Sequence, residues 1–453
     1  MVPIIDEFSR IAKDYLQQIN DRSVFPHSED LEKMKLLDVP LQKQPIDPVK
    51  VIQELHEFGS KATVASAGSR YFGFVIGGAL PASLGANLVA GVWDQNAGIE
   101  AASPISSLLE TICQKWLVTL LNLPRETVVG FVTGATMANF TCLAAARHAL
   151  LQKMGWNVEK DGLFQAPSIK IVVGEEVHAS VLKVLGMLGL GRNNVVKIPV
   201  DSQGRMKSDL IREYSEPVII CAQAGNVNTG AFDPIDDICE IASRMNAWVH
   251  IDGAFGLWAN ASPQYKHLCK GIHKANSWAT DAHKWLNVPY DSGIAFVRDK
   301  RHLVSAMSMD AAYLISGTKR EPYHYVPELS RRARGIEIWA ALRSLGKKGL
   351  AQLIERNCFQ AKLLAEKLSA AGYQILNDVV LNQILVSFGD SDTTKRVIQK
   401  VQEDGTCWCG GTEWQEKTAM RISVSSWRTT EEDIEKSANA IIKIAGKENP
   451  FTD

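Results

Sequence analysis

The stretch "VVGFVTGATMANFTCLAAARHALLQ", residues 128–152, contains the signals of a strand, a turn and a helix in direct succession. Its first six residues form a short apolar and β-branched run, which is typical of a buried strand. Small residues follow, and the remainder places apolar residues at helical spacing. A strand that leads through small residues straight into a helix indicates an α/β fold.

The same alternation continues along the chain. Apolar runs occur at 169–174 (IKIVVG), 217–225 (PVIICAQAG), 248–256 (WVHIDGAFG) and 293–299 (GIAFVRD), and helical patterns at 179–191 and 233–247 lie between them. Such alternation predicts parallel strands joined by crossover helices. Ligand sites in open parallel sheets form beyond the carboxyl ends of the strands, so the loops after these runs are the candidate site.

The pattern changes at both ends of the chain. Residues 1–65 read as helices broken by VFPHSED and DVPLQKQPIDP, and beyond about residue 345 long helices alternate with a few short strands. We therefore expect three parts, which are an N-terminal helical arm (1–65), a large α/β domain (66–344) and a small α+β domain (345–453).

Composition points to an ordinary soluble globular protein. Of 453 residues, 46% are hydrophobic and 22% charged, and 49 basic residues nearly balance 50 acidic ones, for a net charge of −1. This balance gives no reason to expect a nucleic-acid or membrane partner. The N-terminus has the mixed charges of an amphipathic helix rather than a signal peptide, so we expect a cytoplasmic protein.

Two features could suggest other classes. Residues 71–93 carry no charge, but their glycines and Pro81 favour a turn and a buried helix over a membrane span. Eight cysteines in a chain of this length do not make a disulfide framework. The one close pair, Cys407 and Cys409, lacks the second pair or nearby histidines of a typical metal site, so we expect no metal.

The loops after the runs carry the candidate chemistry. At TGATMAN, the free backbone N–H groups of a helix start and the hydroxyls of Thr133 and Thr136 could cradle a phosphate, although a plain strand–helix turn explains the motif too. In EEVHAS, His178 begins the next helix. Its imidazole could stack on a planar ring or act as an acid or base. The alternative is a histidine at the helix terminus whose hydrogen bonds are satisfied there.

Two further residues complete the pattern. Asp252 ends the run WVHIDGAFG, where a carboxylate needs a partner; Ala254 and Gly256 leave room for a flat group, and a helix cap or ion pair is the alternative. Lys284 lies in the aromatic stretch SWATDAHKWLNVPYDSG, residues 277–293. A lysine in a water-poor pocket loses its proton more readily and attacks carbonyl groups, whereas an ordinary surface lysine does neither.

Pyridoxal 5′-phosphate (PLP) fits all four features together. Lysine forms a Schiff base with its aldehyde, an aspartate keeps its pyridine nitrogen protonated, a helix start binds its phosphate, and a histidine covers one face of its ring. The four features follow one another on successive loops of the predicted sheet. We therefore expect PLP as the cofactor, with Lys284 as the lysine that holds it.

At this point the chain resembles the PLP-dependent group II amino-acid decarboxylases, which include the aromatic-L-amino-acid, histidine and glutamate decarboxylases. The resemblance rests on GATMAN, VHASV, HIDGAFG and DAHKWLNVPYD and covers most of residues 60–453. It implies fold type I, with an aminotransferase-like large domain and a mainly parallel seven-stranded sheet. It also implies a helical arm, a small C-terminal domain, and a homodimer with active sites at the interface.

The resemblance also implies roles for single residues. Lys284 would be the Schiff-base lysine and Asp252 the partner of the pyridinium nitrogen, with His178 and Ala254 on opposite faces of the ring. The phosphate would be held by Gly134, Ala135 and Thr136 with help from His283. The family pattern implies these roles at the matching positions of this sequence.

Two segments depart from the family pattern. Asp281-Ala282 stands before His-Lys where many members have Asn-Pro, and VIGGALPAS replaces a Pro-Thr turn that is frequent in members selective for aromatic substrates. Members also have a mobile loop whose tyrosine returns a proton to the substrate. SGTKREPYHYVPELSRR (316–332) occupies that place, with Tyr323 and Tyr325 as candidates and Tyr323 slightly favoured.

The expected function is removal of the α-carboxylate of an L-amino acid. Arg421 in AMRISVSSW is a candidate anchor for the substrate carboxylate, with an ion pair between lobes as its alternative. Other enzymes of this fold remain open, namely an aminotransferase, a carbon–carbon lyase or an aldehyde-forming oxidative decarboxylase. A catalytically silent binding or scaffold protein is the reading from another class, and the intact lysine, aspartate and histidine disfavour it.

Overall fold

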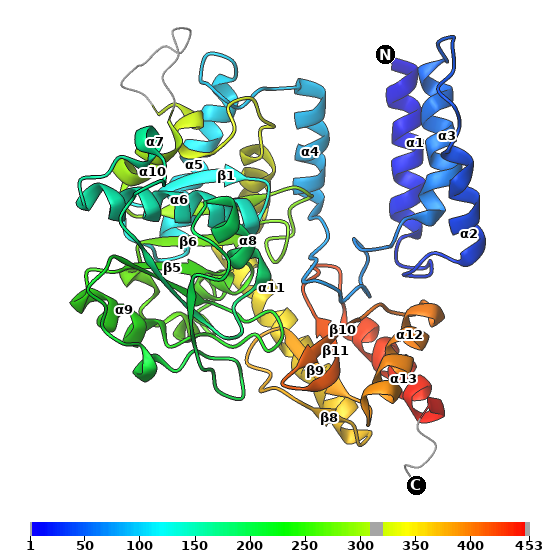
Figure 1. The fold of residues 1–453 in the computed structure, drawn as a ribbon. Helices are drawn as coiled ribbons and strands as arrows, with labels where there is room; N and C mark the ends of the chain where they lie inside the picture. The colour runs from blue at the N-terminus through cyan, green and yellow to red at the C-terminus, as the bar shows by residue number, and fades with distance from the viewer. Residues whose placement is uncertain (1, 309–319, 449–453) are drawn as a thin grey trace. The chain divides into compact units, whose positions relative to one another are not determined.

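The computed structural model of the protein describes residues 2–308 and 320–448, and it divides into two compact units (Figure 1). Unit 1 consists of residues 1–76, 360–376 and 384–453, and unit 2 of residues 77–359 and 377–383. The three-part division expected from the sequence stays a prediction.

Unit 2 is built on a seven-stranded sheet in the order β1-β7-β6-β5-β4-β2-β3. Strand β7 is antiparallel to both neighbours, and the other pairs are parallel. The predicted α/β fold with a mainly parallel seven-stranded sheet is therefore confirmed. The strands are β1 (Val128–Val132), β2 (Lys170–Gly174), β3 (Val195–Ile198), β4 (Val218–Gln223), β5 (Trp248–Asp252), β6 (Ser277–Asp281) and β7 (Gly293–Val297).

Helix α6 packs against the sheet of unit 2, and its residues form part of the hydrophobic core there. It contacts β1, β5, β6 and β7 as well as helices α8 and α10. Its small residues, such as Ala138 and Ala145, are buried and allow this close packing. The helices of this unit are α4 (Pro81–Trp93), α5 (Pro104–Leu120), α6 (Ala135–Lys153), α7 (Val158–Asp161), α8 (Ala179–Met187), α9 (Ile235–Arg244), α10 (Lys300–Met307) and the first part of α11 (Gly335–Ala370), which bends at Gly346.

One strand was not expected from the sequence, and one expectation was wrong. The sequence SWATD forms strand β6, although its pattern favours neither helix nor strand; it is buried on both faces, so no alternation marks it. Residues 81–93 form the expected helix α4, but only Ser83 and Ala90 of it are buried. An apolar sequence predicts that a segment is covered by other protein, but it does not identify the part of the protein that covers it.

Unit 1 combines helices from the N-terminus with a small sheet from the C-terminal part. Its four-stranded antiparallel sheet has the order β10-β11-β9-β8. The strands are β8 (Gln374–Ile375), β9 (Gln383–Ser387), β10 (Gly410–Trp414) and β11 (Lys417–Ser423), and the helices are α1 (Val2–Gln18), α2 (Ser28–Lys33), α3 (Pro48–Gly59), α12 (Ser391–Asp404) and α13 (Glu431–Glu448). Across both described ranges, every helix is too short or too polar to cross a membrane.

Candidate active site

The candidate site lies where the parallel strands of unit 2 end. Because β1 and β6 both run opposite to β7, β1 is parallel to the remaining strands of the sheet. Their carboxyl ends therefore meet at one edge, and β7 begins there. Gly293, the first residue of β7, pairs with Val132 on one side and with Asp281 on the other. This pairing brings the loops after β1 and β6 together.

The loop after β1 leads directly into the N-terminus of α6. The helix begins at Ala135, and Gly134 before it provides no side-chain cap. The first-turn N–H groups have no acceptor within a helix, so they form a ready site for an anion. The approach is close, because a Cβ atom on Gly293 would lie 2.4 Å from the backbone of Gly134. This arrangement fits the predicted phosphate group, with Thr136 in the same turn.

Asp281 is the residue of this site that sequence reasoning missed. One of its carboxylate oxygens accepts the Ala135 N–H at 2.5 Å, and the other lies 3.1 Å from the Lys284 ammonium. Asp281 is buried, while the Lys284 side chain keeps 19% of its exposure. The sequence marks Asp281 only as a departure from the Asn that many family members have, because its partner Ala135 lies 146 residues away along the chain.

His283 lies between Asp281 and the start of α6. Its Nδ1 accepts the Ser292 N–H at 3.1 Å, so in the neutral ring the proton is on Nε2, which lies 3.4 Å from an Asp281 oxygen. Burial lowers the pKa of His283, which favours this neutral form. The ring stacks on Tyr290 with centroids 4.4 Å apart. The Nε2–H of His283 therefore lies near Asp281, the residue that accepts the first N–H of α6.

Asp252 ends β5 at the same edge and is buried. Its Oδ1 accepts the Ala254 N–H at 3.3 Å, and its Oδ2 accepts the side-chain amide of Asn139, on α6, at 3.3 Å. Ala254 is tied to the lysine loop, because its carbonyl accepts the Asp281 N–H at 2.8 Å. The structure thereby links Asp252, Ala254, Asp281 and Lys284 in one group.

His178 occupies the loop after β2, as expected. It is the N-cap of α8, with Nδ1 accepting the Ser180 N–H at 3.2 Å and lying 2.7 Å from the Ser180 hydroxyl. The residue is exposed to solvent on the unit as described. His178 therefore caps the start of α8 through Nδ1, and Nε2 lies on the other side of the ring.

The two candidate tyrosines lie in a 3-10 turn, η7 (Pro322–Tyr325), which packs against β1 and α10. Tyr323 is 4% exposed and Tyr325 is 2% exposed. The guanidinium of Arg320 covers the ring of Tyr325 at 4.3 Å. Both rings are buried because this segment is a turn, in which alternate residues do not point to opposite sides as they do in an extended strand. The expected loop residues 314–319 lie outside the described residues.

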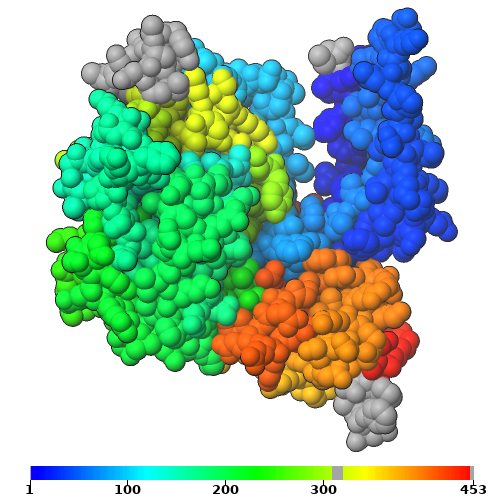
Figure 2. All heavy atoms as spheres, in the orientation of Figure 1, coloured from blue at the N-terminus to red at the C-terminus, as the bar shows by residue number. Residues whose placement is uncertain are grey.

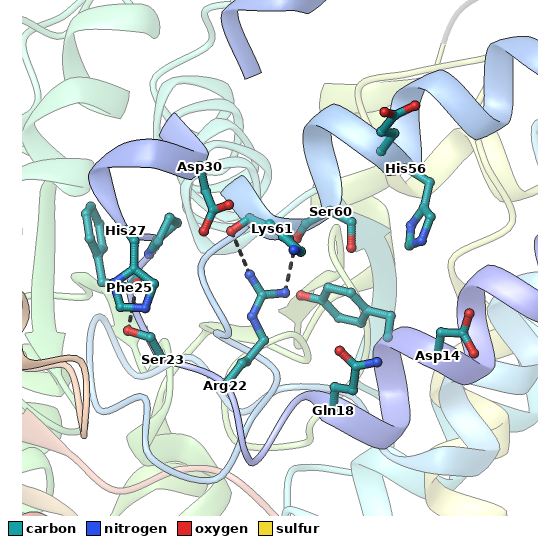
Figure 3. Close-up of a pocket in the computed structure, with 13 residues that line it drawn as sticks. Asp14, Gln18, Arg22, Ser23, Phe25, His27, Asp30, His56, Ser60 and Lys61 are labelled. Atoms are coloured by element: carbon teal, nitrogen blue, oxygen red, sulfur yellow. Dashed lines mark hydrogen bonds between the residues drawn. The ribbon is translucent and has the colours of Figure 1, made fainter. Parts of the chain in front are cut away.

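Two other features belong to unit 1. Arg421 lies in β11, and its burial lowers the pKa of its guanidinium without removing the charge. A hollow of about 600 Å³ lies among α1, α2 and α3, where Arg22 donates hydrogen bonds to the backbone carbonyls of Ser60 and Lys61 (Figure 3). Its lining residues fall between 14 and 61 and include none of the residues grouped around Lys284.

Comparison with known proteins identifies several relatives. An aromatic-L-amino-acid decarboxylase of Bacillus atrophaeus is 26% identical over 373 residues, which cover 77% of this chain and 74% of the relative. The acidic amino acid decarboxylase GADL1 of Xenopus tropicalis is 27% identical over 401 residues, which cover 83% of this chain and 77% of the relative.

The fold agrees with these sequence similarities. The crystal structure of Oryza sativa TDC with PLP and tryptamine superposes with a TM-score of 0.90 at 18% identity, covering 98% of this chain and 97% of the other. The sequence pattern described as the pyridoxal-dependent decarboxylase conserved domain matches residues 31–388. The chain therefore belongs to the pyridoxal-dependent decarboxylases, a family of PLP-dependent carboxy-lyases.

Proposed function

We propose that this enzyme removes the α-carboxylate of an L-amino acid and releases the corresponding amine and CO₂ at the sheet edge of unit 2. The observation that carries the proposal is the group of Lys284, Asp281 and the start of α6, with Asp252 on the adjacent strand. When bound there, the pyridine ring of PLP accepts the electron pair that departing CO₂ leaves on the α-carbon.

Lys284 and α6 hold opposite ends of the cofactor in this proposal. The Lys284 amine would hold the cofactor through its aldehyde carbon. Thr136 and the first-turn N–H groups of α6 bind the phosphate, and the Nε2–H of His283 adds a further donor.

Asp252 holds the protonated ring nitrogen, and the ring lies between two residues. Ala254 follows Asp252 and is small enough to contact one ring face, while His178 at the start of α8 covers the other. A buried carboxylate that accepts only neutral N–H donors is well suited to pair with a pyridinium cation.

We assign the return of a proton to the α-carbon to Tyr323. Tyr325 is the weaker candidate, because the cations of Arg320 and Lys300 lie over its ring at 4.3 and 5.9 Å. Tyr323 is buried too, so η7 has to move when substrate binds. Such movements of loops on a rigid sheet are common steps in catalysis.

Substrate selection is assigned to the segment Gly77–Leu80 and to Arg421. A Cβ atom on Gly77 would lie 2.1 Å from the Lys284 carbonyl oxygen, and the Leu80 N–H donates to the Asn287 carbonyl at 2.8 Å. The segment is thus in contact with the lysine loop. Arg421 is the proposed anchor for the substrate carboxylate.

We also propose a homodimer with active sites at the interface. The N-terminal helices and α4 expose many large hydrophobic side chains, more than a monomer normally leaves in water. They include Val2, Ile5, Phe8 and Leu16 of α1, Val51 and Leu55 of α3, and Leu88, Val89, Val92 and Trp93 of α4. Figure 2 shows atoms of the N-terminal helices, in dark blue, at the surface. A second copy of the chain is the proposed cover.

A cytoplasmic location completes the proposal. All eight cysteines are buried and form no disulfide. Unpaired thiols are usual in reducing compartments and unusual in secreted proteins.

The function is tested with the PLP-loaded enzyme. Borohydride reduction followed by peptide mapping is expected to place the pyridoxyl label on Lys284, and Lys284→Ala is expected to lose it. Incubation with the twenty amino acids and diaminobutyrate is expected to release CO₂ and amine in equal amounts from one or a few of them. A label on Lys266 or Lys274 would contradict the site, and an aldehyde with ammonia would favour the oxidative alternative.

Asp281→Asn is expected to bind inorganic phosphate about fivefold more tightly, because a carboxylate that uses the Ala135 N–H competes with an anion and repels it. Calorimetric titration of the cofactor-free protein measures this affinity. Asp299→Asn is the matched control, since Asp299 caps α10 through the Arg301 N–H. Equal or weaker binding in Asp281→Asn would mean that Asp281 orders the phosphate site instead of competing for it.

Tyr323→Phe is expected to slow amine formation by about 100-fold or more, because it removes the proposed proton donor and keeps the ring. Tyr325→Phe is expected to act mainly on thermal stability. Amine and aldehyde are measured separately, since a delayed proton return exposes the α-carbon to oxygen. If both variants decarboxylate at the native rate, the donor lies elsewhere, and His178 is next.

Val92→Asp is expected to shift the protein from dimer to monomer in sedimentation at low micromolar concentration, because Val92 is 73% exposed on α4 and a buried charge in the interface is costly. Phe164→Asp is the control, because Phe164 is 93% exposed and lies outside the helices of the proposed interface. A native protein that sediments as an active monomer would refute the dimer.

A further inference from the structure

A chain of buried polar side chains lies directly behind Asp252 and ends on it. Trp248 donates its indole N–H to the Ser277 hydroxyl at 2.9 Å, and that hydroxyl lies 2.9 Å from Nδ1 of His250. Nε2 of His250 lies 2.8 Å from the Asn139 carbonyl oxygen, and the Asn139 amide donates to Asp252 at 3.3 Å. Strands β5 and β6 and helix α6 contribute to the chain.

Each member of the chain is withdrawn from water. Ser277, His250 and Asn139 have no exposed surface, and Trp248 and Asp252 are nearly buried. Buried polar groups without partners are costly, so each of these groups depends on its neighbours for hydrogen bonds. A change at one position is therefore passed to the next.

The direction of every hydrogen bond follows from the chemistry of the two ends. An ionised Asp252 only accepts, so Asn139 presents its NH₂ group to it and its carbonyl to His250. His250 must then carry its proton on Nε2. Burial lowers the pKa of His250 to about 3, so the ring is neutral and Nδ1 accepts from Ser277. Ser277 can do so because the indole N–H of Trp248, which only donates, satisfies its oxygen.

We propose that Ser277, His250 and Asn139 are positioning residues that hold the Asp252 carboxylate in one orientation, and thereby keep the ring nitrogen of the cofactor protonated. The inference rests on the proposed role of Asp252. Without His250, the Asn139 amide is free to rotate by half a turn and present its carbonyl oxygen to Asp252. The carbonyl oxygen and the Asp252 carboxylate are then two facing acceptors that repel each other, so the carboxylate turns away from the orientation that suits the ring nitrogen.

This chain of contacts runs behind the carboxylate and leaves its cofactor side open. Oδ1 of Asp252 accepts one further N–H, from Ala254, and a carboxylate has room for more than two donors. The three residues therefore act through Asp252 and do not contact the cofactor in the proposal. Their effect should appear in the protonation of the ring rather than in the loss of the Lys284 linkage.

The test loads the enzyme with PLP labelled by nitrogen-15 in the ring and records the nitrogen resonance by NMR. His250→Leu and Asn139→Leu are expected to move the resonance toward that of an unprotonated pyridine. They should also raise the dissociation constant of PLP about tenfold, which is ~1.4 kcal/mol. His250→Gln keeps an N–H donor at this end of the side chain and is expected to retain the protonated resonance. Ser277→Ala removes a single oxygen and guards against failure of the larger substitutions to fold.

Thr141→Val is the control for a merely structural effect. Thr141 lies on α6 two residues beyond Asn139, is fully buried, and bonds only its own helix at the Met137 carbonyl. It should lower stability without moving the nitrogen resonance. If His250→Leu, Asn139→Leu and Ser277→Ala all keep the protonated resonance, the inference is overturned.

Asp252→Asn separates the inference from the proposed function. If the nitrogen resonance shifts in Asp252→Asn but not in the His250, Asn139 and Ser277 variants, the positioning role is overturned and the role of Asp252 stands. An unchanged resonance in Asp252→Asn overturns both. In every variant, borohydride labelling of Lys284 checks independently that the cofactor is bound at the proposed lysine.

Discussion

The candidate site depends on one buried carboxylate. Asp281 accepts the first N–H of α6 and pairs with the Lys284 ammonium, and so joins two segments that lie 146 residues apart from Ala135 to Asp281. A carboxylate in this position is stabilised by a helix N-terminus and by a cation at once. The same contact places the proposed nucleophile next to the proposed phosphate site, which is what a compact phosphorylated aldehyde requires at its two ends.

The reversed strand β7 makes this contact possible. It separates β1 from β6 in the sheet although both run in the same direction, and its first residue, Gly293, pairs with Val132 and Asp281. Any side chain at Gly293 would collide with the backbone at Gly134. The distance between the Lys284 loop and the start of α6 is thus set by the backbone pairing of β7 and by the lack of a side chain at Gly293. Both features belong to rigid elements of the sheet.

The interior behind the site is polar where an ordinary sheet core is apolar. Helix α6 packs mostly through alanine and other small residues, yet it places Asn139 against His250 and Asp252. Such a fully paired network favours one arrangement of its members, because any other leaves a donor or acceptor without a partner. Its presence behind Asp252 is consistent with a site that needs a carboxylate of fixed orientation and charge.

The sequence alone determined the fold class, the family and the positions of Lys284, Asp252 and the α6 turn, because strand–helix alternation and short motifs are local signals. It also predicted the edge at which they meet, since parallel strands share their carboxyl ends. It did not reveal strand β6, whose burial on both faces removes the alternation, or the exposure of α4. Only the tertiary structure decided that Asp281 binds Ala135, that Asn139 and His250 stand behind Asp252, and that both Tyr323 and Tyr325 are buried. Those contacts join residues distant in sequence, and their geometry depends on how the whole sheet and α6 pack together.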